Sequence, residues 1–190
     1  DKYRQLLRDG KEIESRLAEN LPEHVNAEIA LGTISGIGDV MDWLETTFYY
    51  HRAGYAPGEQ AYDDVRSRVR GVLDDLLDRG FVETEDGLGL SSTPVGQLAS
   101  AYYLRLSTAA SFRELVDVEP EPRTVLGRVA DAAEFDSVSA REAEREAIDS
   151  VLGAQTGSLE PGARKVLAIL EGAMDGELPP ELRSDAWVIR

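Results

Sequence analysis

One short hairpin signal stands in a chain whose other apolar patterns are helical. The pair Asp86-Gly87, a strong two-residue turn signal, separates strand-like segments at 81–85 and 88–91. Upstream of it, apolar residues recur with the period of a helix in three segments: 24–34, 39–51 and 59–79. Three helices followed by a hairpin and a further helix form the order of a winged helix. The pattern therefore predicts a mainly α-helical chain that begins with a winged-helix domain.

The part of the chain after the hairpin predicts helices only. Thr93-Pro94 is typical of a helix start, with threonine as N-cap and proline in the first turn of a helix at 93–104. Ser107 is expected to cap the next helix, and 118–122 is interpreted as a linker. Apolar periodicity predicts the remaining helices: 123–133, 141–152, 161–174 and a last one from Ser184. The expected organisation has three parts: a leading linker or helix at 1–22, a winged helix at 23–106 and an all-helical bundle at 107–190.

The segment 59–79 occupies the position of the recognition helix in a winged helix. Gly80 follows it, where helices commonly end in glycine, and its polar face carries Arg66, Arg68 and Arg70. Arg66 and Arg70 lie one turn apart and are candidates for phosphate contacts. An alternative is that nearby acids neutralise these arginines: Asp63, Asp74 and Asp75. Because acids outnumber arginines here, packing on a neighbouring protein domain is favoured over reading of a DNA groove.

The acidic excess limits which partners the surface can bind. The 190 residues include 36 acids and 20 bases, a net charge of -16. Such a charge excludes a generally basic nucleic-acid-binding surface, but it permits a local arginine site. Only Lys2, Lys11 and Lys165 are lysine among the bases. Because the acid is spread evenly and arginine replaces lysine, we expect a high-salt cytosol, with ordinary acidic solubility as the alternative.

The sequence contains few groups that perform chemistry. It has no cysteine, which excludes disulfides and cysteine-based zinc sites, and His24 and His51 are isolated. It has no Walker A loop, and its glycines at Gly32, Gly36 and Gly38 are interpreted as helix ends. We therefore expect no catalytic, cofactor-binding or metal-binding residues in this chain. It also has no membrane-spanning apolar run and no signal peptide, so a cytoplasmic location without membrane contact is expected.

Four parts of the chain share an ordered pattern with a known family. They are 11–17 with 24–29, 42–50, 80–82 with 93–104, and Glu134-Phe135 with 141–144. In this order they resemble the C-terminal accessory region of Ski-like superfamily 2 DExH-box helicases, a group that includes the archaeal HelQ-like repair helicases. The resemblance covers essentially the whole chain, although each pattern alone is loose.

The resemblance implies a role in a larger machine rather than a reaction. Because the chain starts at Asp1 rather than methionine, we expect a fragment of an ATP-dependent helicase whose upstream RecA-like motor domains bind ATP and Mg. In this family the winged helix packs on the motor. The helical, ratchet-type domain helps to enclose and guide a single strand during 3'-5' unwinding. A haloarchaeal DNA-repair helicase is the expected member, with DNA preferred over RNA.

The resemblance also points to nucleic-acid contacts near the end of the chain. The family presents a long ratchet helix with an arginine and an aromatic residue to the strand, and 184–190 resembles only its start. Trp187 is a candidate for stacking on a base and Arg190 for holding a phosphate. The favoured alternative is that Trp187 packs into the helical core. A winged-helix DNA-binding transcription regulator is the competing function, and a pure protein-interaction module is a third.

Overall fold

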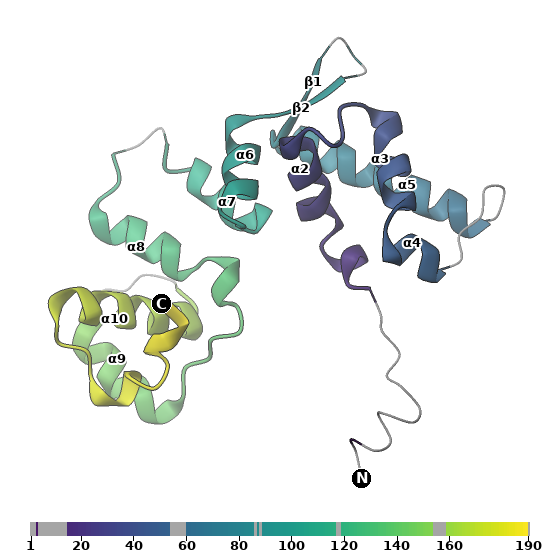
Figure 1. Ribbon diagram of the computed structural model, residues 1–190. Helices are drawn as coiled ribbons and strands as arrows, with labels where there is room; N and C mark the ends of the chain where they lie inside the picture. Colours follow the sequence, from purple (N-terminus) through teal and green to yellow (C-terminus); the bar gives the residue numbers. More distant parts are fainter. Residues whose placement is uncertain are drawn as a thin grey trace. The chain divides into compact units, whose positions relative to one another are not determined.

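The computed structural model describes residues 15–53, 60–85, 89–116, 119–153 and 159–189, together with Tyr3 and Gly87 (Figure 1). The chain divides into two compact units, Asp1–Tyr103 and Leu104–Arg190. The described residues are mainly helical and include a small antiparallel sheet in the first unit. The predicted fold class, a winged helix followed by an all-helical domain, is confirmed.

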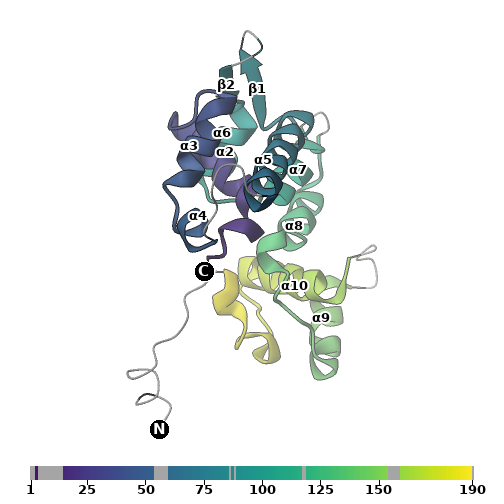
Figure 2. The ribbon, with the colours of Figure 1, turned by 90° about the vertical axis from the view of Figure 1, so that its right-hand side faces the viewer.

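The first unit has the element order of a winged helix. Its described elements are η1 (Leu17–Glu19), α2 (Leu21–Leu31), α3 (Ile37–Glu45), α4 (Phe48–Ala53), α5 (Gln60–Asp78), β1 (Val82–Glu85), β2 (Gly89–Ser92) and α6 (Pro94–Ala101). The hairpin projects from one end of the helices, as Figures 1 and 2 both show. In it, Val82 pairs with Ser92 and Thr84 pairs with Leu90, and an isolated bridge joins Gly36 to Gly89.

The second predicted helix, 39–51, is wrong as a single element. The structure has two helices, α3 and α4, with a break at Thr46 and Thr47. The hydroxyl of Thr46 donates to the carbonyl oxygen of Trp43 at 2.7 Å, and that of Thr47 donates to Leu44 at 2.6 Å. Such side-chain bonds compete with the helical ladder, which explains why the apolar pattern continues while the helix does not.

Helix α5 ends as its sequence predicts. Gly80 takes the left-handed conformation, with φ of 67°. The amide of Gly80 donates to Leu77 and the amide of Phe81 donates back to Leu76, both at 2.9 Å. Glycine is favoured there because it lacks the Cβ that makes positive φ costly. This turn places the fully buried Phe81 at the start of the hairpin.

Helix α2 lies at the centre of the first unit and contacts α5, β2 and α6. Its Val25 is fully buried, and the amide of Asn26 donates to the carbonyl oxygen of Gly96 on α6 at 3.0 Å. A Cβ at position 96 would lie closer than 3.0 Å to the carbonyl oxygen of Phe81. Only glycine therefore lets α6 approach α2 and the start of the hairpin so closely. The predicted cap is confirmed, because the hydroxyl of Thr93 accepts from the Gly96 amide at 3.2 Å.

The second unit is helical throughout its described part. Its elements are α7 (Leu106–Arg113), α8 (Pro122–Ala130), η2 (Ala133–Phe135), η3 (Glu142–Glu144), α9 (Arg145–Leu152), α10 (Pro161–Asp175), η4 (Pro180–Leu182) and η5 (Ala186–Ile189). Helix α10 is its core helix, since it packs on α8 and α9 and every residue from 165 to 169 is buried.

Two expectations for the second unit are wrong. Ser107 does not cap α7, because the helix begins one residue earlier at Leu106 with Arg105 at the N-cap position. The last predicted helix, from Ser184, is the short 3-10 turn η5. Among the described residues, neither unit contains a helix that is long and apolar enough to cross a bilayer.

Candidate nucleic-acid interface

Arg66 and Arg70 lie on the exposed face of α5. Val65 and Val69, each next to one of them, are buried, so the two arginines project away from the core. Within the described part of the chain neither arginine side chain has a hydrogen bond or ion pair, whereas Arg79 bridges to Asp75 at 3.1 Å. The alternative that acids neutralise Arg66 and Arg70 through direct pairs is therefore not seen among these residues.

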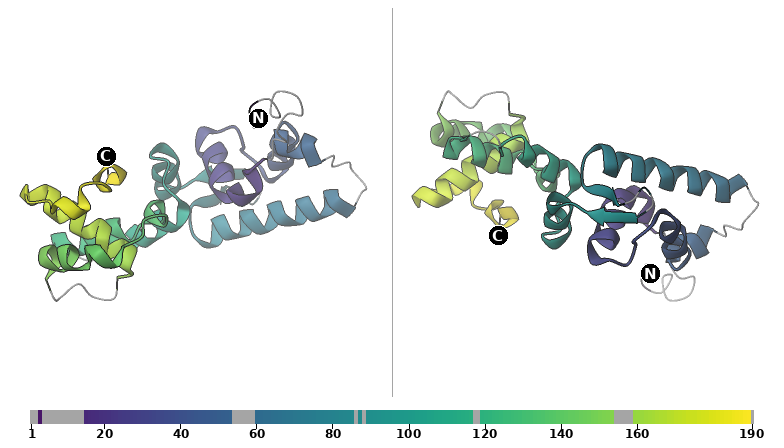
Figure 3. Two further views of the ribbon diagram at one scale, coloured as in Figure 1. Left: turned by 90° about the horizontal axis from the view of Figure 1, so that it is seen from below. Right: turned by 90° about the horizontal axis from the view of Figure 1, so that it is seen from above.

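The wing beside α5 does not favour phosphate. Glu83 is exposed on β1, and two further acids, Glu85 and Asp86, follow it in the sequence. A winged helix that binds duplex DNA with its wing needs a neutral or basic wing, because carboxylates repel the phosphate backbone. This surface therefore argues against duplex binding by recognition helix and wing together. Figure 3 shows α5 as the long helix at the edge of the first unit.

Trp187 lies on η5 in the second unit, and its side chain is 71% exposed. The expectation that Trp187 packs into the helical core is wrong. The core position in this segment is taken by Leu182, which is fully buried, and by the partly buried Ala186. Arg190 lies outside the described residues. The structure thus places Arg66 and Arg70 together on one helix and Trp187 in the other unit.

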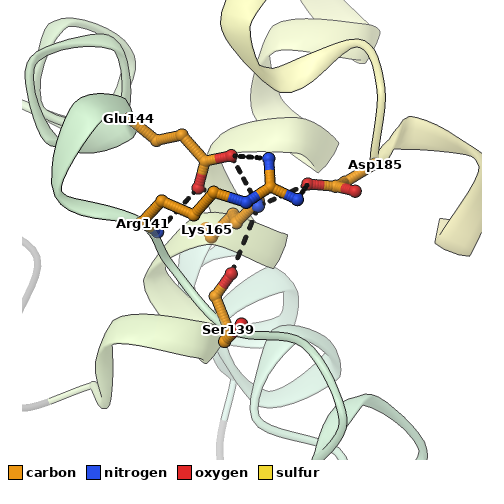
Figure 4. A network of polar contacts seen from close by, with 5 residues as sticks. All are labelled: Ser139, Arg141, Glu144, Lys165 and Asp185. Atoms are coloured by element: carbon orange, nitrogen blue, oxygen red, sulfur yellow. Dashed lines mark hydrogen bonds and ion pairs between the residues drawn. The ribbon is translucent and has the colours of Figure 1, made fainter.

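A buried ionic cluster lies next to the Trp187 segment (Figure 4). The ammonium group of Lys165, on α10, is 2.8 Å from Oε2 and 2.9 Å from Oε1 of Glu144. It also donates to Asp185 at 2.5 Å and to the carbonyl oxygen of Ser139 at 3.2 Å. Lys165 and Glu144 are both almost fully buried, at 1% and 3% exposure. Arg141 adds a second cation, 3.0 Å from Glu144 and 3.6 Å from Asp185.

These contacts keep both carboxyl groups charged. Burial opposes ionisation of Glu144, but hydrogen bonds from Lys165 and the Arg141 amide outweigh burial and hold its pKa below the usual value. The hydrogen bond from Lys165 likewise lowers the pKa of Asp185. Lowered carboxyl pKa values stabilise the fold at neutral pH, and this stabilisation is lost as the pH falls through them.

Sequence reasoning missed the Lys165 cluster, although a signal for it was present. Lys165 is immediately followed by the apolar run Val166-Leu167-Ala168-Ile169-Leu170. A lysine at the edge of such a run is buried only if it is paired. Its partners Glu144 and Asp185 are 21 and 20 residues away, so spacing along the chain does not identify them.

An uncharged surface follows the hairpin in the first unit. Residues 87–104 contain no charged side chain, in a chain that is 29% charged. Leu98, Tyr102 and Tyr103 on and after α6 are 52%, 68% and 93% exposed. Tyr103 also has a φ of 55°, a left-handed conformation that costs a non-glycine residue on the order of 1 kcal/mol. We call Leu98, Tyr102 and Tyr103 the α6 patch.

Two known protein families match consecutive parts of this chain. Residues 92–190 match the Sec63 Brl domain. The chain belongs to the Sec63 Brl domain family. In this Brl family member, residues 14–91 also match a family described as a winged helix-turn-helix domain. The two matches meet at the end of the hairpin.

Relatives of this Brl chain are large proteins. It is 33% identical over 163 residues to activating signal cointegrator 1 complex subunit 3 of Bos taurus, covering 79% of this chain and 7% of that protein. It is 28% identical over 161 residues to the probable ATP-dependent DNA helicase HFM1 of Xenopus tropicalis, covering 80% and 12%. It is 28% identical over 167 residues to the DExH-box ATP-dependent RNA helicase DExH12 of Arabidopsis thaliana, covering 83% and 8%.

The chain therefore spans between 7% and 12% of the length of these relatives. The predicted resemblance to DExH-box helicases is confirmed at the level of these relatives. Two of the segments that carry the resemblance in the Brl chain's winged helix are in direct contact. The segments 24–29 and 93–104 meet at the hydrogen bond between Asn26 and Gly96.

Proposed function

We propose that the chain is the accessory winged-helix and Brl part of an ATP-dependent nucleic-acid helicase. Packed on RecA-like motor domains of the same polypeptide, it helps to guide single-stranded DNA during 3'-5' unwinding. The observation that carries the proposal is that about four-fifths of the chain matches proteins of which two are named as helicases. The ATP and Mg sites belong to the motor domains.

The α6 patch supports packing on the motor. Interfaces between protein domains are depleted of charge at their centre and enriched in tyrosine. In a chain of net charge -16, an exposed uncharged surface with two tyrosines fits such an interface better than it fits a solvated face. The reading frame upstream of Asp1 provides a direct test. A Walker A loop and a DExH box are expected there, and a start codon immediately before Asp1 would overturn the proposal.

Trp187 supports the contact with a single strand. An exposed indole stacks on any base, because every base has a π-face, and such stacking contributes roughly 1–3 kcal/mol per base. The high exposure of Trp187 leaves its ring available for this contact. The exposed Glu83 on the wing and the acidic excess of the sequence disfavour the alternative function, a transcription regulator that binds duplex DNA.

Replacing Trp187 by alanine is expected to weaken binding of a single strand by roughly 5- to 150-fold, which corresponds to the loss of one stacked base. The measurement is fluorescence anisotropy of a labelled oligothymidylate at low salt, with an oligouridylate alongside to compare DNA with RNA. Trp43→Phe, in the first unit, is the matched control and is expected to leave affinity unchanged. Tight binding of duplex DNA that exceeds binding of the oligothymidylate would favour the regulator instead.

Replacing Arg66 and Arg70 together by alanine tests the contribution of α5. If both hold phosphates, binding of the oligothymidylate weakens, and the slope of log affinity against log salt becomes shallower by about 1.4. Arg68→Ala is the control: Arg68 is also exposed on α5, but at two residues from Arg66 and from Arg70 it does not face the same way as they do. An unchanged salt slope in the double variant would remove Arg66 and Arg70 from the interface.

A further inference from the structure

We infer that Lys165, acting through Asp185, is a positioning residue that holds η5 so that Trp187 faces solvent. The inference deepens the proposed function, on which the role of Trp187 in strand binding rests. The juxtaposition that carries it is the contact between the buried ammonium group on α10 and a carboxylate two residues before Trp187. Figure 4 shows Asp185 and Glu144 on opposite sides of the Lys165 ammonium group.

The segment that carries Trp187 does not fix its own position. η4 is a 3-10 turn of three residues, too short to be stable alone, and η5 has the same 3-10 conformation over its described residues, Ala186–Ile189. The backbone hydrogen bonds described within them are local, such as that from the Asp185 amide to Leu182 at 3.2 Å. Three tertiary anchors remain among the described residues: burial of Leu182 against the core, packing of the partly buried Ala186 on the same core, and the carboxylate of Asp185.

These anchors act in different ways. Burial of Leu182 and Ala186 is non-directional and keeps the segment on the core. The contact between Lys165 and Asp185 is directional, and it joins a rigid part of α10 to the residue next to Ala186. Arg141 lies 3.6 Å from the same carboxylate oxygen and limits its movement from a second side. Asp185 therefore sets the orientation in which the chain enters η5.

The choice of lysine at this position is explained by geometry rather than by stability. An apolar residue inside a core is commonly at least as stabilising as a buried ion pair. A lysine donates three hydrogen bonds from one compact point, and here Glu144, Asp185 and the Ser139 carbonyl accept them. A planar arginine does not converge its donors on one point in this way. In this arginine-rich chain, the compact donor is placed where three segments meet.

The test uses the 190-residue chain with Trp43→Phe, so that Trp187 is the sole tryptophan. Asp185→Ala removes the contact but leaves Lys165 paired with Glu144, so the core stays intact. Time-resolved fluorescence anisotropy is expected to report a larger local motion of the Trp187 ring in this variant. Asp185→Asn, which keeps an oxygen acceptor for Lys165, is expected to restore most of the rigidity.

Strand binding provides the second readout. Asp185→Ala is expected to weaken binding of a labelled oligothymidylate by about 5-fold, although removing a carboxylate favours phosphate electrostatically. Asp149→Ala is the matched control: it also removes one acid of the second unit from an ion pair, here with Arg164 at 2.6 Å. It is expected to leave affinity unchanged or slightly higher. Combined with Trp187→Ala, the Asp185 change is expected to add no further loss, because both act on one contact.

The outcomes separate the inference from the proposed function. Unchanged Trp187 anisotropy in Asp185→Ala would overturn the positioning role, whatever the affinity. Increased Trp187 motion, with no loss of affinity in either Asp185→Ala or Trp187→Ala, would overturn the role of Trp187 in strand binding while leaving the structural link intact. A loss of affinity in Asp185→Ala that adds fully to that of Trp187→Ala would also contradict the inference.

Discussion

Replacing Lys165 by methionine is expected to lower the free energy of unfolding of the second unit by about 3–5 kcal/mol. The two side chains have similar length, so the change creates little empty volume. Its main effect is to leave Glu144, only 3% exposed, as a buried carboxylate without its ammonium partner. Asp185 loses the same partner. Urea unfolding of the 190-residue chain with Trp43→Phe, followed by far-ultraviolet circular dichroism and by emission of Trp187, the sole tryptophan left, measures the loss.

Two further variants separate charge from packing in this prediction. Arg145→Met breaks the ion pair between Arg145 and Glu142, whose side chains are 71% and 85% exposed, respectively. This change is expected to alter the free energy of unfolding by less than about 1 kcal/mol. Adding Glu144→Gln and Asp185→Asn to Lys165→Met removes the uncompensated charge and is expected to recover most of the loss. If Lys165→Met unfolds at the same urea concentration as the parent, the cluster does not stabilise the second unit and the prediction is wrong.

Replacing Gly96 by alanine is expected to destabilise the first unit by about 3 kcal/mol, the upper end for overpacking of a core. The added Cβ would lie closer than 3.0 Å to the carbonyl oxygen of Phe81 and to side-chain oxygens of Ser92 and Asn26. The Phe81 oxygen belongs to the backbone at the start of the hairpin, so it cannot rotate away. Relief of the contact requires α6 to move from α2, which breaks the hydrogen bond from Asn26 to Gly96.

Gly71 supplies a matched control for this change. It lies exposed within α5, and a Cβ added there meets nothing within 4 Å. Gly71→Ala is expected to stabilise the first unit by up to about 1 kcal/mol, because alanine favours the helix. Urea unfolding in a Trp187→Phe background, monitored by emission of Trp43 on α3 of the first unit, compares the two variants. Equal effects of the two substitutions would show that α6 does not depend on its close approach to α2.

Much of the winged helix was predictable because its signals are local. Each of three features depends on residues that are close in sequence: the Thr93 cap, the end of α5 at Gly80 and the hairpin. The break between α3 and α4 was not predicted, although Thr46 and Thr47 lie in the sequence. The periodicity of apolar residues depends only on side chains that face the core. It does not detect hydroxyl groups that form hydrogen bonds with the nearby backbone.

The candidate site divides in the same way. The sequence placed Arg66 and Arg70 on one face of one helix, since that follows from spacing alone. It did not determine whether acids pair with them, because many of the 36 acids of the chain offer alternative partners. For Trp187 the sequence favoured the core, where a large aromatic side chain gains most by burial. Tertiary packing fills that core with Leu182 instead and leaves Trp187 exposed.

The sequence by itself determined the order of most helices and of the hairpin, and with it the fold class, a winged helix followed by a helical domain. These features depend on apolar patterns that repeat every two to four residues. Each short segment therefore shows its own pattern, independently of the rest of the chain. Only the tertiary structure decided that Lys165 meets Glu144 and Asp185, and that glycine alone fits at position 96. Both depend on segments that the fold brings together across tens of residues, where the cost of burying a charge or an extra carbon selects the partner.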